Sequence, residues 1–111
     1  MESINWNDFT KVELRVGTIV EAAFFPEARR PAYKLKIDLG PTLGIKKSSA
    51  QITEFYEVED LVGKQVLCVT NFPPKQVGPF ISEVLTTGFV LEDGVVLCTP
   101  DKKIPNGTRL L

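Results

Sequence analysis

The sequence predicts an all-β fold, a small closed antiparallel barrel, and three observations carry that prediction. Apolar and polar residues alternate with a period of two along several short segments, turn residues separate those segments, and helical spacing is confined to one short region. The chain has 111 residues, of which 43% are hydrophobic and 24% are charged, so its composition is globular rather than disordered. We therefore expect one compact domain over residues 1–111.

Three strands are expected in the first half of the chain. Side chains alternate between apolar and polar over residues 12–20, where Gly17 indicates a bulge or a sharp bend. The alternation returns over residues 33–39, with two lysines and an aspartate on the polar face. A Gly-Pro turn follows, and a third strand is expected over residues 43–49.

One short helix and two further strands are expected in the second half. Residues 51–56 and 58–61 have helix-like spacing and are acidic. The apolar run within residues 64–71 is typical of a strand that is buried on both faces, and prolines end it. A longer strand over residues 82–91 leads through a Glu-Asp-Gly turn to a short closing strand, 95–98.

Three strands, one short helix and two more strands form the order of a five-stranded Greek-key barrel of the OB type, here with terminal extensions. The pattern by itself does not separate this barrel from other small antiparallel barrels. Closure of the sheet would hide strand edges that otherwise invite aggregation.

The composition excludes much enzyme chemistry. The chain has no histidine, so it can form no Ser-His pair, no Cys-His pair and no imidazole metal site. Cys68 and Cys98 stand alone in apolar runs without C-x-x-C spacing, so we interpret them as buried free thiols rather than as a disulfide or a zinc site. We expect no catalytic residue, no metal and no cofactor.

The sequence contains no targeting signal that we recognise. The first residues lack a basic segment followed by an apolar one, which a signal peptide requires, and no apolar stretch approaches the ~18 residues of a membrane helix. We therefore expect a cytoplasmic protein with no membrane insertion. The formal net charge of −1 argues against a wholly basic nucleic-acid binder but allows a local basic surface.

Several segments resemble the tRNA-binding OB domains that are appended to methionyl-tRNA synthetases. Residues 9–19 are similar to the entry strand of that domain, and residues 60–66 and 69–72 are similar to its fourth strand. Within this family the chain is most similar to the CsaA proteins, over residues 25–29, 46–53 and 71–85. The resemblance covers essentially the whole chain and implies a tRNA-binding-like homodimer with an export-related chaperone role.

The chain departs from the synthetase-type domain at two places. Ser82-Glu83-Val84-Leu85 stands where that domain usually has Ser-x-Gly-Met, and the loop over residues 71–80 offers only Lys75 where that domain has more bases. Both differences argue against strong affinity for tRNA.

One part of the chain is rich in bases. Residues 29–51 contain a single acid and six bases, which we call the basic surface: Arg29, Arg30, Lys34, Lys36, Lys46 and Lys47. In an OB barrel the ligand lies over strands 2 and 3 and over the loops that join strands 1–2 and 4–5. The basic surface is expected on or beside that region, with Lys75 in the second loop. Clustered cations attract phosphates, although an ordinary solvated strand face is the alternative.

Aromatic residues near the proline-rich loop are further candidates. Phe72 and Phe80 could stack on unpaired bases, cap the barrel, or line an apolar groove for an extended peptide. Tyr33 shares a strand face with apolar neighbours, so we expect it in the core.

Small polar residues at strand ends complete the candidate site. Ser49, Asn71 and Ser82 could hydrogen-bond a phosphate or a ribose, and the family resemblance favours this role for Asn71 and Ser82. The alternative is that they serve turns and caps.

The sequence therefore predicts a non-enzymatic homodimer that binds tRNA or structured RNA through the basic surface, Lys75 and these polar residues. The alternative is a chaperone that holds unfolded precursor polypeptides in a groove lined by Phe72 and Phe80. Pairing is expected through apolar residues near the two ends: Ile4, Trp6, Phe9, Ile104, Leu110 and Leu111.

Overall fold

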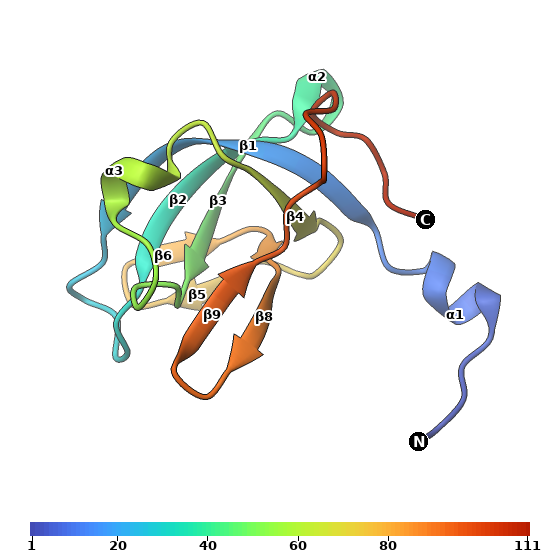
Figure 1. The fold of residues 1–111 in the computed structure, drawn as a ribbon, viewed down its shortest axis with the longest axis horizontal. Coiled ribbons are helices and arrows are strands. Elements are labelled where there is room, and N and C mark those ends of the chain that lie inside the picture. Colours follow the sequence, from blue (N-terminus) through green and yellow to red (C-terminus); the bar gives the residue numbers. More distant parts are fainter.

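A computed structural model describes residues 1–111, and its main body is a barrel of short strands (Figure 1). The strands are β1 (Leu14–Phe24), β2 (Tyr33–Asp38), β3 (Ile45–Ala50), β4 (Gln65–Val69), β5 (Lys75–Val77), β6 (Phe80–Ser82), β7 (Leu85–Thr86), β8 (Gly88–Leu91) and β9 (Gly94–Leu97). The helices are α1 (Trp6–Thr10), α2 (Gly40–Leu43) and α3 (Val58–Leu61). None of the helices is long and apolar enough to cross a membrane.

Five strands form the barrel, and the gap between its two edge strands, β3 and β7, is bridged by the residues around Glu83. The antiparallel sheet has the order β3-β2-β1-β4-β7. On the far side of β3, the amides of Glu83 and Val84 both donate to the carbonyl of Lys47, at 2.8 and 3.3 Å. The hydroxyls of Ser48 and Thr86 meet at 2.8 Å across the same gap. The nearly closed five-stranded barrel confirms the predicted all-β fold, with α3 between β3 and β4.

The core lies inside the barrel and follows the predicted alternation. In β2 the buried positions are Tyr33, Leu35 and Ile37, while the residues between them face outward. The buried cluster comprises Ile19, Tyr33, Leu35, Ile37, Leu39, Ala50, Ile52, Leu61, Val66, Cys68, Val84 and Leu97. Since side chains alternate across a strand, the inward positions of β2 fix which of its lysines face solvent.

The bulge in β1 lies at Val20 and not at Gly17, where the sequence predicted a bulge or a sharp bend. The register between β1 and β2 shifts between Ile19 and Glu21, which leaves Val20 unpaired and 42% exposed. Gly17 is needed for another reason. A Cβ there would lie 2.6 Å from Cγ2 of Ile37, so the absent side chain allows β1 and β2 to pack closely.

The helices differ from the prediction in three places. Only Val58–Leu61 is helical in the region expected to form the acidic helix; residues 53–55 form a turn, and residues 51, 52 and 56 are irregular. The Gly-Pro turn is one turn of helix, α2. The third difference is α1, which was not predicted from the sequence. It begins with a capping box, in which the side chains of Asn5 and Asp8 each accept a hydrogen bond from the other residue's backbone amide.

The strand predicted over residues 82–91 is broken into three pieces. β6 ends at Ser82, β7 covers two residues beside β4, and β8 then pairs with β9 in a separate hairpin. A further hairpin, β5–β6, occupies residues 75–82, where the sequence predicted only a loop and a strand start. A run of apolar residues predicts that a segment is extended. It does not predict where the chain leaves one sheet and enters another.

Residues 107–110 form an additional partner for β1. The amide of Gly107 donates to the carbonyl of Val16 at 2.7 Å, and the amide of Val16 donates to the carbonyl of Thr108 at 3.0 Å. The amide of Leu110 donates to the carbonyl of Leu14 at 2.9 Å. In contrast, α1 extends away from the barrel at the other end of the chain (Figure 1).

The two free thiols are expected to react at very different rates. Burial raises the pKa of the Cys68 thiol to about 12, although a hydrogen bond with Thr86 lowers this pKa to a smaller extent. The thiol therefore stays protonated at pH 8. Cys98 is only half-buried. We expect a thiol-exchange reagent at pH 8 to titrate Cys98 in the native protein and Cys68 only after unfolding. A prompt native reaction that persists in Cys98→Ser would contradict this.

Candidate functional site

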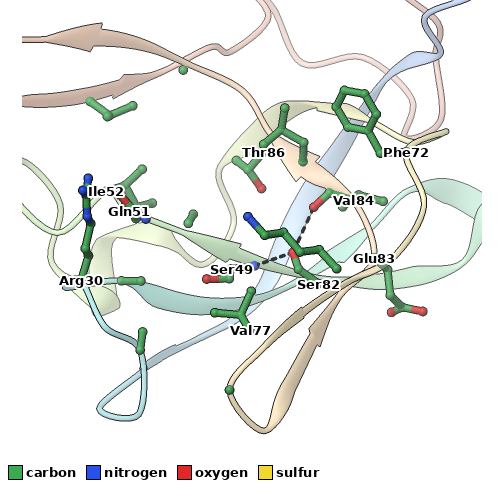
Figure 2. A pocket seen from close by; sticks show the side chains of 18 of the residues that line it. Arg30, Ser49, Gln51, Ile52, Phe72, Val77, Ser82, Glu83, Val84 and Thr86 are labelled. Atoms are coloured by element: carbon green, nitrogen blue, oxygen red, sulfur yellow. Dashed lines mark hydrogen bonds between the residues drawn. The ribbon is translucent and has the colours of Figure 1, made fainter.

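A groove of about 1510 Å³ opens beside the end of β3 (Figure 2). Its walls come from separated segments: the β1–β2 loop (residues 27–32), the end of β3 with the residues after it (49–52), the stretch from Phe72 through β5, and residues 82–88. Two valines of the β8–β9 hairpin complete the lining. These segments correspond to the strand 1–2 and 4–5 loops that the OB prediction placed at the ligand face.

Six of the predicted site residues line this groove: Arg29, Arg30, Ser49, Phe72, Lys75 and Ser82. In Figure 2, Arg30 and Phe72 lie on opposite sides, with Ser49 and Ser82 between them. The Ser82 hydroxyl accepts from the amide of Ser49 at 3.0 Å and donates to the carbonyl of Val84 at 3.3 Å. Ser82 therefore already helps to close the barrel.

The remaining lysines of β2 and β3 lie apart from the groove lining. Lys34, Lys36 and Lys47 alternate with buried positions and thus lie on the outer face of the two strands. Lys36 and Lys47 are directly opposite each other in the register. Lys46 instead pairs with buried Ile37, so it belongs to the inward-facing row of β3 and is separated from the other lysines.

Two aromatic rings are packed between two of these lysines. The rings of Phe25 and Phe80 are 5.4 Å apart between centroids. The ammonium of Lys34 lies 5.5 Å from the Phe25 centroid, and that of Lys47 lies 5.3 Å from the Phe80 centroid. Because Phe25 is buried, this contact fastens the β5–β6 hairpin to the β1–β2 loop. Phe80 is therefore engaged, whereas Phe72 is exposed.

Tyr33 lies in the core, as predicted. Its hydroxyl donates to the carbonyl of Tyr56 at 2.7 Å. Its pKa is raised by burial and, to a smaller extent, by the charges of Glu57, Glu59 and Glu54. Tyr33 thus offers no ring face to a ligand.

Asn71 does not line the groove, and its side chain makes two long-range hydrogen bonds. Its amide oxygen accepts from the amide of Glu13 at 3.0 Å, and its amide nitrogen donates to the carbonyl of Lys11 at 2.7 Å. These bonds tie the segment before Phe72 to the segment that joins α1 to β1. They are not the local turn that was the alternative for Asn71, and its contact with RNA stays a prediction.

Most cations around the groove form no ion pair. The ion pairs of the molecule join Lys11 to Asp8, Arg15 to Glu13, Lys36 to Glu21 and Arg109 to Glu13. Within the basic surface and Lys75, only Lys36 is ion-paired, at 3.1 Å in an exposed setting where such pairs are weak. Two acids, Glu27 and Glu83, also line the groove, and the Glu83 carboxylate accepts from the amide of Lys47 at 3.0 Å.

Several lining residues were absent from the predicted site. They include Gln76, Val77, Thr86 and Thr87, together with Glu27 and Glu83. The Val-Gly-Pro sequence at residues 77–79 is a turn signal that could have revealed the β5–β6 hairpin. No sequence signal identifies the two threonines, because their place depends on barrel closure. No three His, Cys, Asp or Glu side chains are grouped so that they could hold a metal ion.

Residues 14–109 match the family described as "Putative tRNA binding domain". The chain belongs to this tRNA-binding domain family. Its relatives in the family include methionine–tRNA ligase 1 of Bacillus anthracis, 38% identical over 98% of this chain, and methionine–tRNA ligase of Thermococcus kodakarensis, 34% identical over 99%. The chain spans only 16% and 14% of those two proteins. The predicted resemblance to the tRNA-binding domains of methionyl-tRNA synthetases is thus confirmed.

Two solved structures match this chain over their full length. The chaperone CsaA from Bacillus anthracis has a TM-score of 0.93 and 50% identity, covering 99% of this chain and 100% of that one. The CsaA chaperone protein from Picrophilus torridus has a TM-score of 0.92 and 50% identity, covering 98% and 100%. The predicted similarity to CsaA proteins is therefore confirmed as well.

Proposed function

We propose that this chain is a non-enzymatic RNA-binding protein whose ligand is tRNA or another structured RNA. The observation that carries the proposal is the gathering of unpaired cations at the ligand face of a tRNA-binding-family barrel. Arg29, Arg30 and Lys75 line the groove, and Lys34 and Lys47 lie on the adjoining strand faces without carboxylate partners. Such a concentration of charge attracts phosphates even though the net charge is −1. We place this activity in the cytoplasm.

In this proposal the cations hold the RNA backbone and leave its sequence unread. Phosphate contacts set the position of a nucleic acid, whereas sequence is read at base edges. Binding should therefore weaken steeply as salt increases, because each neutralised phosphate releases counterions. The departures of residues 82–85 from the synthetase-type pattern fit a weaker binder than the synthetase domains.

A competition experiment tests the proposal. Labelled tRNA bound to the protein is challenged with unlabelled tRNA, with an unfolded precursor polypeptide, and with heparin as a polyanion control. We expect tRNA to displace itself and the polypeptide to leave it bound. Failure to detect any tRNA binding at low salt would contradict the proposed function.

A second candidate function, binding of unfolded polypeptide, is favoured by the apolar part of the groove. Phe72, Val77 and Leu85 contribute exposed or half-buried side chains to the lining, and such side chains suit an extended peptide. Both CsaA structures are also described as chaperones. Displacement of tRNA by the unfolded polypeptide would mean that one surface serves both ligands, in line with the export-related role.

We further propose a two-fold homodimer. Trp6 on α1 is 66% exposed, and Ile4 and Leu111 are similarly exposed, which leaves apolar surface uncovered near both ends. We expect light scattering at micromolar concentration to give twice the chain mass of 12.3 kDa. We also expect Trp6→Glu to shift the mass toward 12.3 kDa. A native protein that scatters as a monomer would contradict the dimer.

A further inference from the structure

One side of the groove carries an exposed aromatic ring, Phe72, that contacts no other ring and no cation. Phe72 is 54% exposed and takes no part in the ring–ring and cation–ring contacts that engage Phe25, Phe80 and Tyr33. Phe72 lies three residues beyond the end of β4, and the side chain of the preceding residue, Asn71, is hydrogen-bonded to Lys11 and Glu13 in the segment before β1. The ring is therefore held at the rim of the groove with its apolar surface open to a ligand (Figure 2).

The opposite side of the groove carries exposed cations. Arg29 and Arg30 extend from the β1–β2 loop, and neither forms an ion pair. The Gln51 amide is exposed beside Arg30 and makes no hydrogen bond within the molecule, so both its donor and its acceptor are free. The groove thus combines a free ring, a free amide and free guanidinium groups within one concave surface.

These three chemistries match an unpaired nucleotide rather than a duplex. In an A-form helix the base faces are covered by stacking, so a protein ring can stack only on a base that has left the helix. Guanidinium groups bind the flanking phosphates, and a side-chain amide can pair with a base edge. The outer lysines Lys34 and Lys47, by contrast, can contact phosphates of either form.

We infer that the groove takes an unpaired stretch of RNA, a loop or a single-stranded end, with one base stacked on Phe72 and adjacent phosphates on Arg29 and Arg30. The inference rests on the proposed RNA-binding function and names the part of a structured RNA that enters the groove. Duplex parts of the same RNA lie over the outer face of β2 and β3.

The test compares three ligands with similar numbers of phosphates: an unstructured pyrimidine oligonucleotide, a blunt RNA duplex, and tRNA. Affinities are measured by fluorescence anisotropy over a salt series for the native protein, Phe72→Ala and Phe72→Trp. Phe89→Ala is the matched control, because Phe89 is also a well-exposed ring but lies on the β8–β9 hairpin outside the groove lining. Light scattering and thermal unfolding check that all variants keep the native assembly and fold.

We expect Phe72→Ala to weaken binding of the oligonucleotide and of tRNA by roughly 5- to 100-fold, as loss of one base–ring stack should. The salt slope should stay unchanged, because no phosphate contact is lost. Phe72→Trp should retain affinity, and duplex binding should be unaffected by either substitution. Phe89→Ala should leave all three affinities as they are.

Three results would overturn the inference. The first is tRNA binding that Phe72→Ala leaves intact, and the second is equal loss for duplex and single strand; in both cases the proposed RNA-binding function stands. The third is loss of unfolded-polypeptide binding in Phe72→Ala with RNA binding intact, which would assign the groove to polypeptide. Absence of binding to every RNA would instead remove the proposed function itself.

Discussion

Replacing Lys34 and Lys47 together by glutamine is expected to reduce the slope of log affinity for tRNA against log salt by about 1.4 to 1.8. Each lost phosphate contact removes roughly 0.7 to 0.9 from that slope. Both ammonium groups lie on the outer face of β2 and β3 without a carboxylate partner. Affinity should fall at low salt, while discrimination between RNA sequences should hardly change.

The remaining two lysines give a graded comparison. Adding Lys46→Gln should have little further effect, because Lys46 belongs to the inward-facing row of β3. Adding Lys36→Gln should reduce the salt slope by less than one full phosphate contact, because Lys36 is already paired with Glu21. Lys102→Gln with Lys103→Gln, two exposed positions near the other end of the chain, is the matched control. A folded Lys34/Lys47 variant with an unaltered slope would show that the RNA lies elsewhere.

Replacing Ile37 by alanine is expected to lower the free energy of unfolding by about 2 to 5 kcal/mol. Ile37 is fully buried, and it packs against Gly17 on β1, where no side chain could shift to fill the space. A domain of this size has a total stability of roughly 5 to 15 kcal/mol, so the loss is a large fraction of it. Urea unfolding measures the change.

Val20→Ala is the control for the core substitution. Val20 is also a β-branched residue on the neighbouring strand, but the bulge leaves it unpaired and partly exposed. We expect its truncation to cost under about 1 kcal/mol. Similar losses for both variants would mean that the barrel interior is not packed as described.

The sequence predicted the barrel well where one strand face is buried and the other is solvated. Residues 33–39 show this best, because a period of two places Tyr33, Leu35 and Ile37 inside and both lysines outside. It failed at residues 82–91, which contribute β7 to the barrel and then leave it at residue 88 for a separate hairpin. Local hydrophobicity is the same in either arrangement, so only the tertiary pairing decides where the strand breaks.

The sequence named residues for the candidate site but could not predict which of them line the groove and which lie on the faces of β2 and β3. Charge clustering grouped these bases along the chain, but Lys46 and Lys47 lie on opposite faces of β3, and neither lines the groove with Arg30. Asn71 contacts Lys11 and Glu13 instead of lining the groove, a role that depends on residues 58 and 60 positions away. Hydrogen bonds of that span have no signature in a single sequence.

The hydrogen bonds between residues 107–110 and β1 have a consequence for how the protein is made. β1 is synthesised well before residues 107–110, so three of its backbone groups, at Leu14 and Val16, lack their partners until residues 107–110 have left the ribosome. Pairing over so long a separation closes late and folds slowly. Until then the start of β1 exposes one edge, so a nascent chain paused before residue 107 should be the species most open to proteolysis and to chaperones that bind nascent chains.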